Sequence, residues 1–266
     1  MIFLFSIPLA AAAFIFESYP RFVNREYGVD IWTHLIYLKE FKKQKKMPVN
    51  MKNGFIFSGD YDYPPVFMWI LSKLPFRLVE KYEFLFSPFF DSIHLILIFL
   101  FAYMLTSSIY IAFLTQALYV LTPIIILENS SATPRSLGYT LFTIVMMSIF
   151  FYQNSGNMWL LILAIVSGAL IFLTHRFTTQ GFLFFAIIFG VLEKSLLFPS
   201  IFLVSFVLAL VFSKGFYWKV LNGHLGNLMF WKKNIEHRYA HQVKGNLSPK
   251  KTKDFIFRIY TQFLKF

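Results

Sequence analysis

The sequence contains no cysteine, which excludes disulfides, thiolate metal sites and cysteine nucleophiles and leaves the redox compartment undetermined. Charged residues are also scarce, since they make up 14% of the 266 residues, whereas hydrophobic residues make up 57% and phenylalanine alone occurs 36 times. A soluble domain of this size does not need so much apolar surface. The composition therefore excludes an ordinary soluble protein and confines any chemistry to carboxylates, histidines and hydroxyl groups.

Several apolar runs approach the roughly 20 residues that a membrane-spanning helix needs. We therefore predict an all-α fold, a polytopic transmembrane helical bundle of about seven spans. The first span is expected from Ile2 to about Tyr19, although its stretch Ala10 to Ala13 resembles the end of a signal peptide. The other expected spans are Phe89 to Thr106, Ile109 to Leu127, Leu137 to Tyr152, Met158 to Thr174, Gly181 to Leu192 and Leu196 to Phe212.

A long polar insertion follows the first span at residues 17–88 and carries eleven basic and eight acidic residues. We interpret it as a folded extramembrane loop of a core that covers residues 1–213. Within it, Asp30 to Lys46 shows the apolar spacing of an amphipathic helix. A second short helix is expected from Val66 to Leu74, with Pro65 suited to its first turn.

The tail at residues 214–266 holds eleven basic residues against two acidic ones, and so supplies nine of the twelve net positive charges. With its tryptophan and other aromatic residues, it suits an anionic lipid surface better than nucleic acid. We predict a basic amphipathic tail on the membrane surface and no nucleic-acid partner. The apolar run Phe255 to Phe266 resembles the start of a further helix, as in a shortened or fragmentary chain.

Two arguments about topology conflict. Seven spans place the insertion and the tail on the same side of the membrane, opposite the N-terminus, whereas the positive-inside rule favours a cytoplasmic tail. The orientation of the tail therefore stays open.

Four polar segments carry the chemically informative residues. Asp30 ends the segment Tyr27 to Asp30 before the amphipathic helix, and Asp60-Tyr61-Asp62-Tyr63-Pro64-Pro65 follows within the insertion. Thr133 to Gly138 and His175 to Gln180 occupy later polar loops. Together these segments resemble the GT-C superfamily of integral-membrane glycosyltransferases. The resemblance covers most of residues 1–213 in layout, and each motif is short. It implies an enzyme that transfers a sugar from a polyprenyl-phosphate-linked donor at the extracytoplasmic membrane face.

In that family the first extracytoplasmic loop supplies a catalytic carboxylate, and Asp30 matches it by position. Inverting sugar transfer needs a carboxylate that accepts the proton of the acceptor hydroxyl as the anomeric carbon is attacked. The resemblance therefore implies that Asp30 is the general base. Asp30 also fits the structural role of N-cap of the amphipathic helix, which is compatible with catalysis.

Asp60 and Asp62 are one residue apart, so an extended chain points both to the same side. With Asp30 they are candidates to assist catalysis or to share a divalent cation, Mg²⁺ or Mn²⁺. The family is divided on metal dependence, and no residue is assigned as a metal ligand. The alternative is a turn before the two prolines, where Asp is common.

The phosphate of the leaving group requires cations near the membrane face. Arg135, His175 and Arg176 are the candidates, because a charge near a span is costly and often functional. The alternative is ordinary snorkelling to the interface. Gln180 and Thr178 are candidates to donate hydrogen bonds to sugar or phosphate oxygens.

His34 lies four residues after Asp30 on one helix face, where it can orient Asp30, join a metal site or be a plain surface residue. His237 and His241 repeat this spacing beside Glu236, but without a third ligand at a recognisable distance a wet helix face is favoured over zinc.

Asp91 and His94 lie near the start of a span and are expected to be buried polar partners, and Glu128 is a candidate second acidic group of the site.

The prediction is thus a multi-pass glycosyltransferase of a prokaryotic plasma membrane, with unknown acceptor and oligomeric state. The alternatives are a transporter, a lipid-binding protein or an inactive relative. A transporter predicts repeats, interrupted spans and polar residues near the midplane, whereas the ionisable residues of this sequence are expected at loop edges.

Overall fold

The computed structural model describes residues 2–28, 30–51 and 59–244. The chain is mainly helical, as predicted, and the helices outside the insertion are η1 (Ile2–Ser6), α1 (Ile7–Val23), α5 (Phe86–Thr106), α6 (Ile109–Val120), α7 (Pro123–Asn129), α8 (Arg135–Ser155), α9 (Met158–Phe172), α10 (Arg176–Leu192), α11 (Leu197–Phe212) and α12 (Phe216–Lys244). The insertion forms α2 (Asp30–Gln44), β1 (Val49–Met51), β2 (Gly59–Tyr61), α3 (Val66–Ser72), α4 (Phe76–Tyr82) and η2 (Glu83–Leu85).

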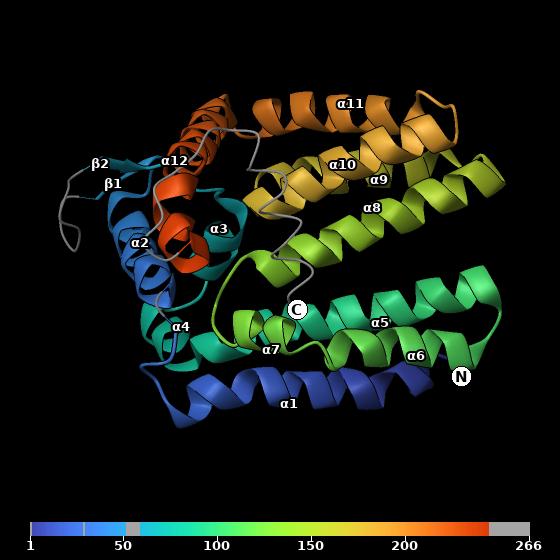
Figure 1. Ribbon diagram of the computed structural model, residues 1–266, viewed down its shortest axis with the longest axis horizontal. Coiled ribbons are helices and arrows are strands. Elements are labelled where there is room, and N and C mark those ends of the chain that lie inside the picture. Colours follow the sequence, from blue (N-terminus) through green and yellow to red (C-terminus); the bar gives the residue numbers. More distant parts are fainter. Residues whose placement is uncertain (1, 29, 52–58, 245–266) are drawn as a thin grey trace. The chain divides into compact units, whose positions relative to one another are not determined.

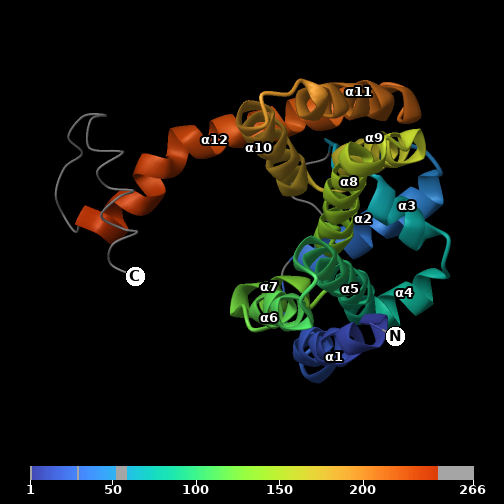
Figure 2. The same cartoon turned by 90° about the vertical axis from the view of Figure 1, so that its right-hand side faces the viewer.

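The chain divides into two compact units, Met1–Val220 and Leu221–Phe266. In the first unit, α1, α5, α6, α8, α9, α10 and α11 run side by side (Figure 1). Figure 2 views this bundle from one end of the helices. The described part of the second unit continues α12 as far as Lys244. The side chains of His237 and His241 and the run Phe255 to Phe266 lie outside the described residues.

The helices are those of a membrane protein. Ile2–Val23, Phe76–Thr106 and Arg135–Ser155 are each long and apolar enough to cross a bilayer, and the described residues give up to five spans if each bent helix pair counts as one. α9 and α10 are apolar but shorter. The larger number of about seven spans stays a prediction.

One predicted span is interrupted. The run Ile109 to Leu127 forms two helices, α6 and α7, which are bent by 62° relative to each other. Pro123 starts α7, where its missing N–H is tolerated, but the same ring prevents α6 from continuing through it. This break differs from the expected continuous helix.

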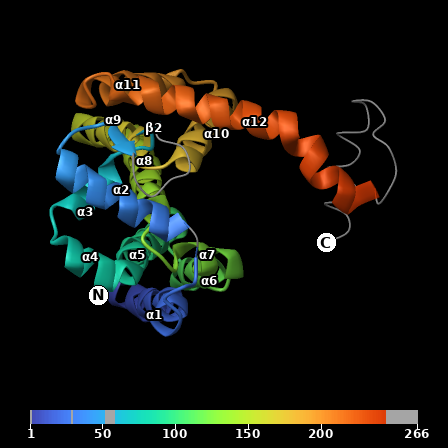
Figure 3. The ribbon, with the colours of Figure 1, turned by 90° about the vertical axis from the view of Figure 1, so that its left-hand side faces the viewer.

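The insertion lies at one end of the bundle (Figure 1), and Figure 3 views α2, α3 and α4 from that side. α2 and α3 confirm the two predicted helices, with Pro65 at the N-cap of α3. The antiparallel pair β1 and β2, with Asn50 opposite Asp60, is an exception to the all-α expectation. The Gln44 side chain fixes β1 beside α2, because its amide donates to the Asn50 carbonyl (2.8 Å) and accepts from the Asn50 N–H (3.1 Å).

The first helix runs further than predicted. α1 continues to Val23, so Glu17 and Arg21 are buried residues of the first helix. The Arg21 Nε donates to Glu83 Oε1 at 2.7 Å, and both side chains are almost fully buried. Because Glu83 balances its charge, the Arg21 cation is tolerated in the buried C-terminal part of α1.

Small residues allow close helix packing in the bundle. α9 has no room for a side chain at Gly168, which lies against Ser205 of α11 and Phe182 of α10. The Ser205 hydroxyl donates to the Ile165 carbonyl at 3.0 Å. Such contacts are the usual basis of helix association in membranes, where lipid competes with apolar side chains.

Candidate functional site

The segment that follows β2 returns to the bundle and contacts the start of α10. The Val66 N–H donates to the Leu173 carbonyl at 2.9 Å, which fastens the first turn of α3 to the end of α9. Arg176, the first residue of α10, donates from Nη2 to the Asp62 carbonyl (3.1 Å) and to Asp62 Oδ1 (3.3 Å). The predicted site residues Asp62 and Arg176 are therefore brought together.

A group of aromatic side chains surrounds this pair. The Arg176 guanidinium lies over the Tyr63 ring, 5.2 Å from its centroid. Tyr61 stacks on Tyr63 at 5.9 Å, and Tyr37 of α2 lies 4.4 Å from Tyr61 between ring centroids. Burial raises the pKa of Tyr63 and of Tyr37 to about 12, so both phenols keep their protons at neutral pH. The site thus offers neutral hydroxyl groups next to one fixed cation.

His34 is a buried part of this group. Its ring meets Tyr63 edge-on at 5.6 Å. Burial lowers its pKa to about 4, and the nearby Asp30 carboxylate opposes this shift only in part. The imidazole is therefore neutral at pH 7, and the interpretation of His34 as a plain surface residue is wrong, because the side chain is buried.

Asp30 begins α2 and is exposed, one helical turn before His34. Its charge lies near enough to raise the pKa of His34, Tyr61 and Tyr63. The carboxylate is thus at the solvent side of the tyrosine and histidine group, where an incoming hydroxyl group can reach it.

Asp60 has different partners from Asp62. It accepts hydrogen bonds from Asn50 Nδ2 (3.2 Å) and from Lys219 Nζ (2.6 Å), which hold the pKa of its carboxyl below the usual value. Asp62 contacts Arg176 instead, so the two carboxylates do not converge as the extended-chain argument predicted. Among the described residues, no three His, Asp or Glu side chains are grouped as metal ligands, and this donor set does not fit the suggested Mg²⁺ or Mn²⁺.

The start of α8 lies against the start of α10. A Cβ on Gly138 would lie 2.6 Å from Thr178 Oγ1 and 3.1 Å from His175 Cβ, so glycine is required for this approach. His175 is buried, and its Nδ1 lies 2.9 Å from Thr178 Oγ1. Its ring also meets Tyr139 of α8 edge-on at 6.5 Å. His175 therefore helps to join these helices.

Arg135 begins α8 and forms an ion pair with Glu128 of α7, so the candidate acidic residue is the partner of a candidate cation. Arg135 also lies near enough to Tyr63 to act on its pKa. Gln180 is half-buried on α10, one turn after Arg176. Arg135 and Arg176, which belong to the two later polar loops, are thus both close to Tyr63.

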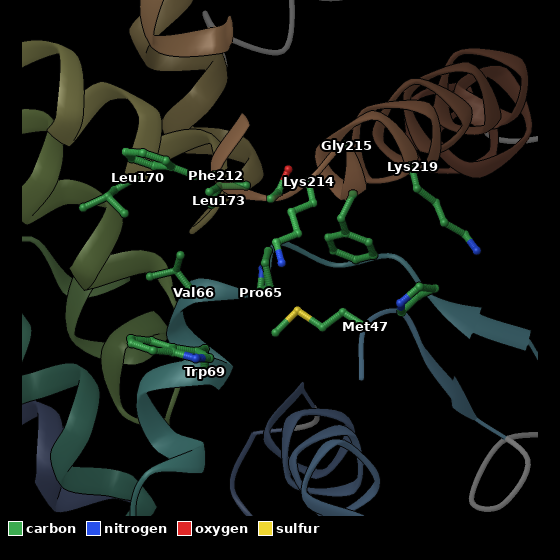
Figure 4. Close-up of a pocket in the computed structure, with 13 residues that line it drawn as sticks. Met47, Pro65, Val66, Trp69, Leu170, Leu173, Phe212, Lys214, Gly215 and Lys219 are labelled. Atoms are coloured by element: carbon green, nitrogen blue, oxygen red, sulfur yellow. The ribbon is translucent and has the colours of Figure 1, made fainter. Parts of the chain in front are cut away.

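A cavity of about 710 Å³ adjoins the site. Most of its wall is apolar, and Lys214 and Lys219 supply the charged groups; Figure 4 shows the Lys214 side chain directed toward Pro65. The wall residues are Met47, Pro48, Pro65, Val66, Trp69, Leu170, Leu173, Phe212, Ser213, Lys214, Gly215, Phe216 and Lys219. Because Pro65 closely follows Asp62 and Leu173 closely precedes Arg176, the cavity lies next to the carboxylate–guanidinium pair.

The sequence alone did not single out the tyrosines of this site or the two lysines of the cavity wall, which are Tyr37, Tyr61, Tyr63, Lys214 and Lys219. Tyr61 and Tyr63 are one residue apart, as are the aspartates, so the same extended-chain argument places the two tyrosines on one face. Lys214 directly follows the apolar run of α11, in a turn where Gly215 adopts φ +82°. In membrane proteins, a lysine at the end of an apolar helix commonly extends its ammonium group to the interface.

The comparisons with known proteins identify no relative: no family model matches the sequence, and no curated protein matches it.

Proposed function

We propose that this protein is a membrane glycosyltransferase that transfers a sugar from a polyprenyl-phosphate-linked donor to an acceptor at the extracytoplasmic face. The observation that carries the proposal is the position of Asp62 and Arg176, which join the insertion to the bundle beside an apolar cavity. In this proposal the bundle has about seven spans in a prokaryotic plasma membrane.

Asp30 is the general base. The acceptor oxygen attacks the anomeric carbon while its proton passes to the Asp30 carboxylate, and the bond between that carbon and the phosphate oxygen breaks. The exposed position of Asp30 beside His34 supports this role, because an acceptor hydroxyl reaches it from solvent. The neutral imidazole one turn away adds hydrogen-bonding capacity without adding charge.

The leaving polyprenyl phosphate carries the developing negative charge. Arg176 has a buried Nε without a hydrogen-bond partner, so one guanidinium donor stays available for a phosphate oxygen while Nη2 holds Asp62. Asp62 therefore positions Arg176, and Tyr63 supports the guanidinium plane from one face. In this proposal, the other side chains that bind the lipid-linked sugar donor are Arg135, His175 and Gln180.

The apolar cavity suits the isoprenoid next to the phosphate. Its wall consists mainly of aliphatic and aromatic side chains, and Lys214 supplies a cation at the interface. Apolar walls with few polar groups are typical of sites for amphiphilic ligands. Asp60 contributes indirectly, since it fixes Lys219 at the same cavity.

Sugar transfer by the purified full chain tests the proposal. With a polyprenyl-phosphate-linked sugar and a panel of acceptors, the wild-type protein is expected to form product and release polyprenyl phosphate. Asp30→Asn removes the base and is expected to lower the rate by at least about 100-fold, whereas Glu193→Gln, an exposed carboxylate beyond α10, serves as the matched control.

Undiminished transfer by Asp30→Asn would remove Asp30 from the mechanism but leave the enzyme class intact. Absence of transfer by the wild-type protein with every lipid-linked sugar would instead favour the transporter, lipid-binding or inactive alternatives.

A further inference from the structure

A second group of polar side chains is buried inside the bundle, apart from the candidate site. Glu17 of α1, Asp91 of α5 and Asn129 at the end of α7 are 1%, 0% and 0% exposed. The Glu17 and Asp91 carboxyl groups lie within hydrogen-bonding reach of each other, and Asn129 lies beside both. Three helices thus direct oxygen-bearing side chains to one buried point.

Several polar atoms of this group lack a well-formed hydrogen bond, although the three side chains lie within reach of one another. The Tyr119 hydroxyl donates to Asp91 Oδ1 at 2.7 Å, but Glu17 Oε2, Asp91 Oδ2 and both amide atoms of Asn129 lack a well-formed hydrogen bond. Buried polar groups are rarely left in this state, because the desolvation of each costs about 1–3 kcal/mol. The group has the character of a site that is complete only with a ligand.

The charge of the carboxylates is also unbalanced. Arg21, one turn further along α1, is already paired with Glu83 at 2.7 Å. Among the residues whose side chains the structure describes, no lysine, arginine or histidine forms an ion pair with Glu17 or Asp91. Two carboxyl groups so close in a low-dielectric interior require a proton or another cation between them.

The broken span α6–α7 ends at this group, because Asn129 is the last residue of α7. The last turn of a helix presents carbonyl groups without intrahelical partners, and of these the Leu127 carbonyl accepts a hydrogen bond from Ser130 Oγ at 2.8 Å. Interrupted membrane helices coordinate Na⁺ through such carbonyls. The burial of Asp91 agrees with its expected role as a buried polar partner, whereas Glu17, which was assigned to the polar insertion, is buried in α1 instead.

We propose that Glu17, Asp91 and Asn129 form a buried Na⁺ site within the bundle. Glu17 Oε2, Asp91 Oδ2 and Asn129 Oδ1 supply the oxygen ligands, and the ion offsets one of the two carboxylate charges while it ties α1, α5 and α7 together. Mg²⁺ is disfavoured because it keeps several waters, and Ca²⁺ because it takes six to eight oxygen ligands. This site does not depend on the proposed sugar transfer.

A proton competes for the same oxygens, so Na⁺ binding strengthens as pH rises. The ionisable side chains that interact with the group are Tyr119 of α6 and Tyr139 of α8, and His94 of α5 lies against both of these rings. Arg21 of α1 and Arg135 of α8 are paired with Glu83 and Glu128 instead.

The test is thermal unfolding of the purified full chain in detergent, in NaCl and in choline chloride of equal ionic strength. We expect Na⁺ to raise Tm by about 3–5 °C at roughly ten times its Kd, and the shift to grow further with the logarithm of the Na⁺ concentration. Glu17→Gln and Asp91→Asn are each expected to abolish the shift, whereas Glu193→Gln keeps it. An equal Tm in both salts, or a shift that persists in both site variants, would overturn the proposal.

Direct binding of radioactive ²²Na⁺ to the wild-type protein decides the matter if the carboxylate variants do not fold. Saturable binding that weakens between pH 9 and pH 6 supports the site. Binding that is absent at millimolar Na⁺ would show that a proton alone occupies the pair and would contradict the proposal.

Discussion

Arg176 joins the insertion to the bundle through two different surfaces of its guanidinium. The edge donates to Asp62, and the face lies over Tyr63. Lysine keeps the charge but has neither the planar fork nor the stacking face. The geometry of this side chain, rather than its charge alone, therefore determines the candidate phosphate site.

Arg176→Lys is expected to lower kcat/KM for the lipid-linked donor by about 10- to 100-fold, because the guanidinium contacts to Asp62 and Tyr63 are lost. Steady-state kinetics of sugar transfer measure the effect. Arg25→Lys, at an exposed position of the insertion, is the matched control. Equal kinetics for wild type and Arg176→Lys would show that only a positive charge is needed.

His34 predicts how stability depends on pH. Its pKa is about 4 in the folded protein and 6.5 ordinarily, so the unfolded chain binds a proton first as pH falls. The contribution of the neutral His34 ring to the free energy of unfolding is complete above pH 6.5 and is lost as pH falls from 6.5 to 4. Between pH 7 and pH 5 it amounts to about 2 kcal/mol.

Denaturant unfolding in detergent at pH 7 and pH 5 measures this loss. His34→Phe removes the titrating group and is expected to flatten the slope, whatever its effect on absolute stability. The same slope in His34→Phe and wild type would refute the assignment.

At the scale of the elements, the junction between α8 and α10 depends on Gly138. Because a Cβ there would lie 2.6 Å from Thr178 Oγ1, Gly138→Ala is expected to destabilise the protein by about 1–3 kcal/mol. Unfolding in detergent measures the change.

Gly181→Ala in α10 is the control, because a Cβ at Gly181 would meet no atom within 4 Å. Thr178→Ala combined with Gly138→Ala is expected to recover part of the loss. Equal stabilities for Gly138→Ala and Gly181→Ala would mean that the two helices separate at little cost.

The helices were largely predictable from sequence, whereas the contacts between them were not. Long apolar runs specify membrane helices such as α5 and α11 because hydropathy dominates their placement. The short pair β1 and β2 escaped prediction, since Gln44 rather than a strand pattern holds it. Local patterns cannot show such support.

The candidate site was predictable in its residue types but not in its pairings. Asp62 and Arg176 were both selected from sequence, yet their contact depends on the return of residues 62–66 to the end of α9. Asp60 was grouped with Asp62 by spacing, but the strand register places it opposite Asn50. Tertiary contacts between distant segments decide both outcomes.

At the scale of the whole molecule, the insertion and the opposite ends of the helices belong to different sides of the membrane in the proposed function. The chain contains no cysteine, so single cysteines report their side without any prior substitution. Lys43 of α2 and Asn154 near the end of α8 are exposed and suit this purpose.

Lys43→Cys is expected to react with a membrane-impermeant maleimide in intact cells, whereas Asn154→Cys reacts only after permeabilisation. Gel-shift detection of the labelled protein measures both. The reverse pattern would place the candidate site on the cytoplasmic side and contradict the proposed topology.

The cavity beside Asp62 and Arg176 connects the whole molecule to its proposed donor. Its volume of about 710 Å³ and its apolar wall fit an isoprenoid chain, with Lys214 available to the phosphate. Mass spectrometry of the lipids that copurify with the full chain tests this central claim most directly. We predict a polyprenyl phosphate or its glycosylated form, with less recovered from Lys214→Gln than from Lys43→Gln; recovery of ordinary phospholipids alone would contradict the account.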